Sequence, residues 1–138
     1  MKRMSLKNLP ESHTDLIRDE TLSFAYLATS MPDGTPQVTP VWFNTDGEHI
    51  LLNSVKGRIK DRNMRDRPQI AVVVHSQDKP YHYIQLRGKI VEITEEGARQ
   101  HINDLSYKYT GNPEWKLNDP DEIRVTYKLL PEKIQVMG

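Results

Sequence analysis

Residues 53–65 read Asn53-Ser54-Val55-Lys56-Gly57-Arg58-Ile59-Lys60-Asp61-Arg62-Asn63-Met64-Arg65, and this stretch turns an apolar strand into a short helix. The helix opens with Gly57, Arg58 and Lys60. The first amides of a helix lack partners within it and lie at the positive end of its dipole, so a phosphate there gains hydrogen bonds and charge attraction. Gly57 allows the backbone to approach such an anion, and the cations can close over it. The stretch predicts a site for a phosphorylated cofactor, which is typical of an enzyme or a carrier.

Length and composition exclude several classes of protein. The 138 residues predict a single domain, residues 1–138, with no room for separate cofactor and substrate domains. The 19 basic and 19 acidic residues cancel, which argues against nucleic acid or a membrane surface as partner. The absence of cysteine excludes disulfides and thiolate chemistry. No apolar run has the length of a signal or a membrane span, so we expect a cytoplasmic protein.

Turn residues divide the chain into six predicted strands. Asp33-Gly34 and Asp46-Gly47 indicate hairpins, because both residue types tolerate the positive φ of tight turns, and they would join the first three strands into a meander. The fourth strand is a continuous apolar run, which implies burial on both faces. Gly88 suits a bulge in the fifth strand, and Pro131 would break the last one. The predicted strands are 22–30, 36–44, 48–54, 69–75, 81–93 and 121–136.

Two further helices are expected. The clearer one starts with a cap at Thr94, carries an apolar stripe at helical spacing and ends at Gly111. The other covers residues 12–20 and depends on Ser12 and Asp15 as a capping pair. Six short strands with few helices favour a closed or partly closed antiparallel barrel. Because side chains fill a small barrel, a ligand would lie outside it or against a partner.

The basic side chains of the short helix have two interpretations. Arg58, Arg62 and Arg65 share one helical face, and six cations lie between Lys56 and Arg67. A solvated face is the ordinary explanation of such a charge run. The glycine and the position after a strand favour a phosphate site to a similar degree. The residues alone leave both open.

Pro40 marks a second informative stretch, residues 37–43. A proline inside a strand loses a ladder hydrogen bond, so it indicates an edge, a bulge or a place where the backbone turns polar groups toward a flat ligand. The alternative, which the residues alone favour, is an ordinary edge strand with Trp42 and Phe43 in the core.

Motifs of several enzyme classes are absent. The histidines show no metal-ligand spacing, so no metal site is predicted. His82 lies between two tyrosines, a pattern that more often reflects β propensity than catalysis. The sequence has no Gly-x-Ser-x-Gly elbow, Walker loop or Gly-x-Gly-x-x-Gly. Serine hydrolases, P-loop enzymes and classical dinucleotide folds are therefore disfavoured.

Several motifs follow one another in order: Thr29 through Asp33-Gly34, Pro36 to Phe43, Asp46-Gly47, Asn53-Ser54, Gly57-Arg58-x-Lys60-x-Arg62-Asn63, and Pro80-Tyr81-x-Tyr83 through Arg87-Gly88. Together they resemble the flavin and deazaflavin oxidoreductases of the pyridoxamine 5′-phosphate oxidase-like split barrel, and within it the branch described as coenzyme F420-dependent. The resemblance implies a mainly β fold with short helices, a six-stranded antiparallel split β-barrel (the FMN-binding split barrel). It also implies a homodimer with cofactor sites between the subunits.

The resemblance further implies which residues bind the cofactor. Its phosphate would contact Arg58 and Lys60, with Asn53, Ser54, Lys56 and Gly57 close by. Its ring would be bordered by Gln37, Val38, Thr39 and Pro40. The residues expected near the interface are Arg62, Asn63, Tyr83 and Gln85. Thr39 is the candidate for stabilising charge on the reduced cofactor, and no other catalytic residue is predicted.

As a function, the resemblance implies hydride transfer between a flavin-type cofactor and a small conjugated organic substrate. F420 is the expected cofactor and FMN the alternative, since both carry a phosphate and a similar tricyclic ring. Residues 132–138 lack the arginine-rich ending that pyridoxamine phosphate oxidases use, which argues against vitamin B6 oxidation. A non-catalytic cofactor carrier of the same fold stays open, and a nucleic-acid-binding barrel is disfavoured by the zero net charge.

Overall fold

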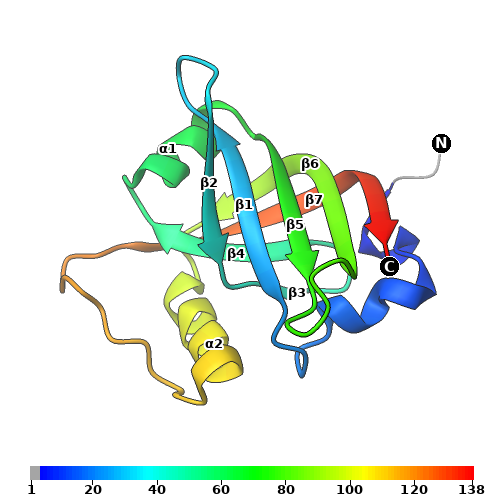
Figure 1. Cartoon of the computed structure of the whole chain (residues 1–138). Helices are drawn as coiled ribbons and strands as arrows, with labels where there is room; N and C mark the ends of the chain where they lie inside the picture. The colour runs from blue at the N-terminus through cyan, green and yellow to red at the C-terminus, as the bar shows by residue number, and fades with distance from the viewer. Residues whose placement is uncertain (1–3) are drawn as a thin grey trace.

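The computed structural model describes residues 4–138, so the first three residues of the predicted domain lie outside the described part. Two 3-10 helices, η1 (Leu6–Asn8) and η2 (Glu11–Ile17), precede a seven-stranded antiparallel sheet (Figure 1). The strands are β1 (Phe24–Ser30), β2 (Pro36–Val41), β3 (Asn44–Thr45), β4 (Ile50–Val55), β5 (Gln69–His75), β6 (Tyr83–Thr94) and β7 (Arg124–Met137). The α-helices α1 (Ile59–Asp66) and α2 (Ala98–Thr110) follow β4 and β6.

The strand order shows that the sheet curls. It runs β2-β1-β5-β6-β7-β4-β3, so β2 and β3 lie at opposite edges. The chain passes from Val41 at the end of β2 to Asn44 at the start of β3, and a connection of this length reaches about 11 Å. The two edges must therefore approach each other, as Figure 1 shows. The predicted partly closed antiparallel barrel is confirmed at this level, but with seven strands instead of six.

The additional strand arises where the sequence predicted one strand over residues 36–44. The chain leaves β2 at Val41, buries Phe43 completely in the core and enters β3. The neighbours of β4 are β3 and β7, so the predicted meander of the first three strands is wrong. β2 lies at an edge of the sheet, as Pro40 indicated, because an edge strand can leave one row of backbone groups unpaired.

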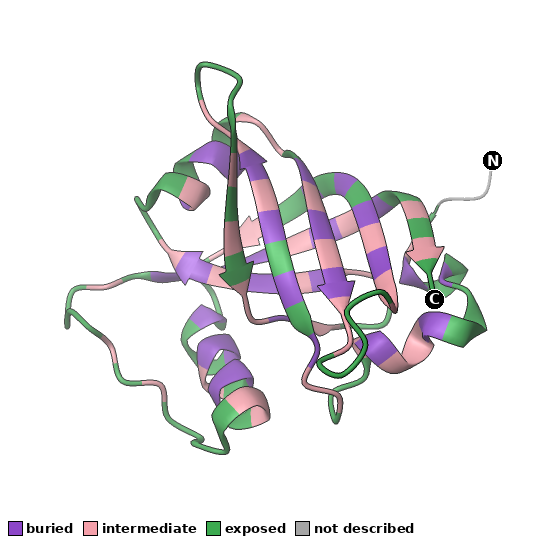
Figure 2. Cartoon of the chain, viewed as in Figure 1, coloured by how far each residue is buried: buried purple, intermediate pink, exposed green. Residues whose placement is uncertain are grey.

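Apolar side chains fill the inside of the curled sheet. Buried residues alternate with more exposed ones along β1, β4 and β5, as expected when one face of a strand points into a core (Figure 2). β5 was predicted to be buried on both faces, but Ile70, Val72 and Val74 are buried while the residues between them are half-buried. The outer face of this strand is therefore partly accessible.

Glycines mark the turns and one bulge. Gly34 and Gly47 have φ of 86° and 94° in the loops after β1 and β3, so both predicted hairpins are confirmed. Gly88 lies at a register shift between β6 and β7, where an added Cβ would be 2.2 Å from the carbonyl oxygen of Leu130. The predicted bulge is confirmed, and the backbone contact explains why glycine is needed. Pro131 lies opposite Gly88 and does not break β7.

The start of α2 differs from the prediction, and its end does not. The helix begins at Ala98, after Gly97 with a φ of 76°. Thr94 accepts a hydrogen bond from the amide of Glu96 and so caps the turn that precedes the helix. Gly111 ends the helix with a φ of 81°, as predicted.

The opening helix is also shifted. It is a 3-10 helix over Glu11–Ile17 with no side-chain cap. Ser12 and Asp15 do not form the predicted capping pair, because the Ser12 hydroxyl contacts His13 and the Asp15 carboxylate contacts His82. Contacts with the rest of the fold outweigh the local capping signal here.

Candidate functional site

A cavity of about 550 Å³ lies between the sheet and α2. Its walls come from β1, β2, β4, the start of α1, α2, the loop after α2 and the start of β7. These segments are far apart in the sequence, and the curl of the sheet brings them together. The cavity has a cationic end and an aromatic end.

Three cations line the first end. They are Arg58 at the N-cap of α1, Lys60 in its first turn and Arg124 at the start of β7. Burial lowers the pKa of Lys60 below its usual value, and the neighbouring charges of Arg58 and Arg124 lower it further. An anion bound among these side chains would relieve their repulsion, so this end of the cavity suits a phosphate.

Asn53 and Glu122 hold Arg124 in place. The Nε of Arg124 donates to Oδ1 of Asn53 at 2.8 Å, and its Nη1 donates to Oε2 of Glu122 at 3.2 Å. The same carboxylate lies 3.5 Å from Nη2 of Arg58. Burial lowers the pKa of Arg124, and Glu122 opposes this shift. Because the Glu122 carboxylate is shared by Arg58 and Arg124, and Lys60 adds a third charge, the cluster keeps positive charge for a ligand.

His101 supports this arrangement from the side of α2. The Nδ2 of Asn53 donates to the carbonyl oxygen of Ala98 at 3.0 Å and lies 3.1 Å from Nδ1 of His101. The other ring nitrogen lies 2.9 Å from Oδ1 of Asn44, and Thr126 contacts Nδ1 at 3.0 Å. Burial lowers the pKa of His101 to about 4, so the ring is neutral at pH 7. A neutral ring that donates from Nε2 to Asn44 accepts at Nδ1.

Aromatic side chains form the other end. Trp42 stacks on Tyr109 with ring centroids 5.3 Å apart and 4° between the planes, and Trp115 meets Trp42 edge-on at 5.4 Å. The Tyr109 hydroxyl donates to the carbonyl oxygens of Ser23 and Phe43 at 3.3 and 3.4 Å. Burial raises the pKa of Tyr109 to about 12, so this hydroxyl stays protonated. Such walls suit a planar ring.

The structure brings four of the predicted residues to this cavity: Pro40, Asn53, Arg58 and Lys60. Lys56 lies beside them in a groove that it shares with Arg58, and its Nζ is 3.0 Å from Oε2 of Glu95. Gly57 has a φ of 92°, and its amide donates to Oδ2 of Asp61 at 2.9 Å. That amide is therefore engaged within the turn.

Three other residues of the same segment lie elsewhere. Ser54 is buried, and its hydroxyl has no hydrogen-bond partner among residues 4–138. The Nδ2 of the buried Asn63 donates to the Thr29 hydroxyl at 3.0 Å, and its Oδ1 accepts from Arg67 at 3.0 Å. Arg62 is exposed on α1. The Asn63 side chain thus ties α1 to β1, and neither Ser54 nor Asn63 lines the cavity.

The remaining predicted residues belong to β2 and β6. Gln37, Val38 and Thr39 lie along the β2 edge, where the Val38 side chain is 66% exposed. Tyr83 and Gln85 lie half-buried in β6. None of the five lines the cavity within the described part of the chain.

Sequence reasoning missed Arg124, Tyr109 and Trp115 as lining residues. Tyr109 was expected only in the apolar stripe of α2, and Arg124 was expected only as part of a long strand. The one signal for Trp115 was a large aromatic side chain in a loop, where a binding role is common. The position of Arg124 follows from the pairing of β7 with β4, which no local pattern reveals.

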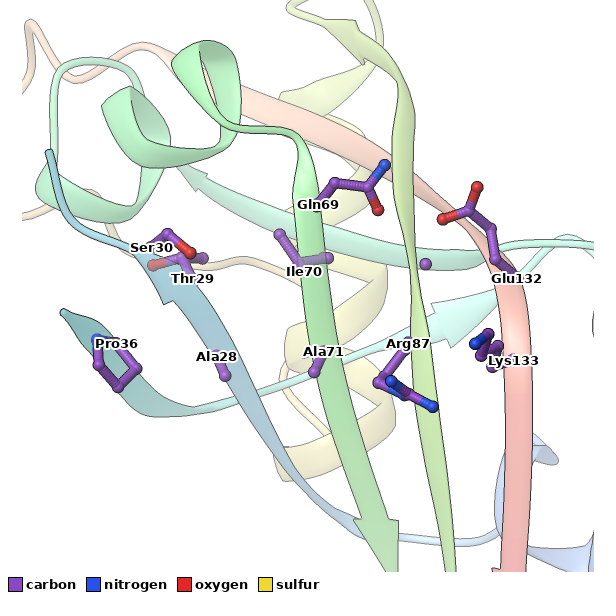
Figure 3. A pocket seen from close by; sticks show the side chains of 11 residues that line it. Ala28, Thr29, Ser30, Pro36, Gln69, Ile70, Ala71, Arg87, Glu132 and Lys133 are labelled. Carbon is purple, nitrogen blue, oxygen red and sulfur yellow. The ribbon is translucent and has the colours of Figure 1, made fainter. Parts of the chain in front are cut away.

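A second, smaller groove of about 380 Å³ lies on the outer face of the sheet (Figure 3). Ala28 and Ala71 line it, and Arg87 lies opposite Lys133 on the neighbouring strand. None of the predicted site residues and no aromatic side chain lines it among residues 4–138. This groove therefore lacks the walls that a flat ring requires.

No helix between residues 4 and 138 is long and apolar enough to cross a membrane. Within the same residues, no group of at least three His, Asp or Glu side chains is placed to hold a metal ion.

Comparison with known proteins gives consistent matches. A family model described as pyridoxamine 5′-phosphate oxidase matches residues 9–138. A solved structure described as an F420 reductase is 30% identical, with a TM-score of 0.79 over 92% of this chain and 98% of that one. The conserved hypothetical protein Rv2991 from Mycobacterium tuberculosis shares the fold at 20% identity, with a TM-score of 0.70 over 99% of this chain and 89% of that one. The General Stress Protein 26 from Bacillus anthracis strain Sterne does so at 19% identity, with a TM-score of 0.68 over 92% of each chain. No curated protein matches.

Proposed function

Because the chain belongs to the pyridoxamine 5′-phosphate oxidase family, we propose that it is an oxidoreductase that transfers a hydride between a flavin-type cofactor and a small conjugated organic substrate. The family match and the likeness to an F420 reductase confirm the resemblance predicted from the motifs, including its F420 branch. They also support a flavin-type cofactor and an oxidoreductase in general terms. The specific cofactor, the substrate and the dimer are parts of the proposal.

One observation carries the proposal: a single cavity has cations at one end and aromatic walls at the other. Arg58, Lys60 and Arg124 form a donor set that fits a phosphate. Trp42 and Tyr109 provide a flat apolar surface for a tricyclic ring. A cofactor that carries both groups matches the cavity better than either a simple anion or a simple aromatic compound would.

The ring is proposed to lie along the β2 edge. Pro40 and Val41 line the cavity directly, and Thr39 precedes them on the same strand. The bound cofactor supplies the hydride chemistry at its central ring. The chain supplies position and electrostatics. Thr39 lies beside the cavity and not in its wall, so its proposed role of stabilising charge concerns a part of the reduced ring that extends past Pro40 along β2.

The outer face of the sheet supports the proposed homodimer. Phe24, Tyr26 and Val38 are 48%, 37% and 66% exposed there. Cross-strand pairing places Tyr26 beside Pro40 on β2 and, through Val73 of β5, in line with Gln85 of β6. An exposed apolar patch of this kind is typical of an interface. It connects Pro40 at the cavity with Gln85, which was expected near a subunit boundary.

F420 is the preferred cofactor, and FMN is the alternative. The preference depends on the 30% identity to the F420 reductase, since the cationic cluster suits the phosphate of either compound. A carrier without turnover has the same cavity but no substrate reaction. Hydride transfer from the reduced cofactor to a panel of enones and quinones separates the enzyme from the carrier.

The test begins with the purified full chain. Its visible spectrum is recorded after incubation with F420 or FMN, and the retained compound is identified by mass spectrometry. Substituting both Arg58 and Lys60 with alanine should weaken binding of the favoured cofactor, because both charges face the proposed phosphate. Arg18→Ala is the matched control, since it removes an exposed arginine that lies after η2, outside the cavity and the sheet. No tight binding of either cofactor to the wild type would refute the proposed function.

A further inference from the structure

Asp61 is a buried carboxylate beside the cationic cluster. Its side chain is 2% exposed and accepts from the Gly57 amide at 2.9 Å and from Nε of Arg65 at 3.0 and 3.1 Å. The hydroxyl of Tyr127 donates to the same carboxylate. Burial opposes ionisation, but these three donors outweigh it and lower the pKa of Asp61. The group is therefore an anion at neutral pH with its hydrogen-bonding capacity largely used.

The three donors come from different parts of the fold. Gly57 belongs to the turn between β4 and α1, Arg65 lies one helical turn further along α1, and Tyr127 is a core residue of β7 with no exposed surface. Asp61 thus joins the turn, the helix and the barrel core at one point. Tyr127 is part of the packed interior, so it gives this point a rigid reference.

The segment fixed in this way carries the cations of the proposed phosphate site. Arg58 follows Gly57 directly, and Lys60 precedes Asp61. The N-cap position is held by Arg58, whose side chain makes no capping hydrogen bond. Asp61, at the third position of the helix, instead reaches back to the Gly57 amide one residue before the N-cap, much as the N3 side chain does in a capping box.

A negative charge next to an anion site should weaken phosphate binding by repulsion. Arg65 offsets part of this charge, but the structure would avoid the cost altogether with a neutral residue at position 61. A carboxylate at this position fixes the geometry of the turn, because its two oxygens can accept from the Gly57 amide, Arg65 and Tyr127 at once.

From this arrangement we infer that Asp61 and Tyr127 are positioning residues, which hold the turn so that Arg58 and Lys60 meet the cofactor phosphate. The inference rests on the proposed function, since it concerns the phosphate of that cofactor. It assigns a binding role to a core tyrosine and a buried carboxylate that touch no ligand themselves.

The experiment compares each cofactor with its dephosphorylated form. Dissociation constants of the full chain are measured for FMN and riboflavin, and for F420 and its phosphate-free deazaflavin. Tyr127→Phe removes only the hydroxyl and should weaken binding of the phosphorylated form about tenfold, while binding of the dephosphorylated form stays within about twofold. Asp61→Asn should also weaken the phosphorylated form, although it removes a repulsive charge.

A core substitution away from the cavity, Val72→Ala, is the matched control for general destabilisation. It should lower the melting temperature without changing the ratio of the two dissociation constants. An unchanged ratio in Tyr127→Phe, or tighter phosphate binding in Asp61→Asn, would overturn the positioning role. A wild type that binds both forms equally would instead refute the proposed phosphate site, and the inference with it.

Discussion

The Nε of Arg124 donates a hydrogen bond of 2.8 Å to Oδ1 of Asn53. Asn53 lies opposite Thr126 in the ladder of β4 and β7, so the arginine reaches it diagonally, across two positions of its own strand. This bond holds the Nε side of the guanidinium against β4. Arg124 at the same time forms part of the cavity wall. Arg124 thus ties two strands together, and we propose that it also contacts the cofactor phosphate.

Replacing Arg124 tests that contact. Arg124→Ala should weaken binding of the phosphorylated cofactor by about tenfold or more, because it removes a charge-assisted hydrogen bond. Arg124→Lys should restore only part of the affinity, since lysine cannot bond to Asn53 and the phosphate with a rigid fork. Titration calorimetry on both variants and on Arg18→Ala measures the effect. Equal losses in Arg124→Ala and Arg18→Ala would contradict a specific contact.

Tryptophan fluorescence should report occupancy of the cavity. Both tryptophans of the chain, Trp42 and Trp115, line it. Binding of FMN or F420 should therefore quench most of the emission, with a midpoint equal to the dissociation constant measured by calorimetry. Trp115→Phe should leave the emission of Trp42 still quenchable. Tight binding of a cofactor with no change in emission would place it outside this cavity.

A charge introduced into the exposed apolar patch on β1 and β2 should weaken the proposed dimer. Val38→Lys should shift the protein from dimer to monomer, because a lysine in an apolar interface must lose its hydration. Light scattering after size-exclusion chromatography measures the mass. Tyr107→Lys, at a position of α2 that is 65% exposed, is the control and should leave the mass unchanged. A wild-type monomer at micromolar concentration would refute the proposed dimer.

His101 should make stability fall in mild acid. Burial lowers its pKa from 6.5 to about 4 in the folded protein, so the unfolded chain binds a proton below pH 6.5 that the folded protein accepts only near pH 4. The contribution is fully present above pH 6.5 and is lost through this window, by about 3 kcal/mol in total. Urea unfolding at pH 7.5 and 4.5 measures the loss. The His101→Gln variant should lose less free energy of unfolding between these two pH values. An equal loss in the variant and the wild type would assign the pH dependence to other titrating groups.

The bulge between β6 and β7 requires glycine at position 88, so a larger residue there should destabilise the fold. Gly88→Ala would place a Cβ 2.2 Å from the carbonyl oxygen of Leu130, so the two strands must separate. We expect a loss of about 2–4 kcal/mol in the free energy of unfolding. Gly34→Ala, where a Cβ meets nothing within 4 Å but the φ is 86°, should cost only about 1 kcal/mol. Similar losses in both variants would show that the close approach at Gly88 costs no more than the positive φ at Gly34.

Local chemistry in the sequence predicted much of the fold. The two Asp-Gly hairpins and the end of α2 at Gly111 follow from a positive φ that few other residues adopt, and the bulge follows from the close approach of two strands that Gly88 permits. The edge position of β2 follows from Pro40 in the same way. The split of residues 36–44 into β2 and β3 could not be predicted, because it results from Phe43 entering a core that only the closed sheet creates.

The candidate site, like the fold, was predicted from the sequence only in part. The sequence by itself determined that a cationic turn follows a strand, since Arg58 and Lys60 are neighbours along the chain. Only the tertiary structure decided that Arg124 completes the cluster, that Tyr127 donates to Asp61, and that aromatic walls share one cavity with the cations. The physical reason is that these contacts join residues distant in sequence, whose meeting depends on which strands pair as the sheet curls.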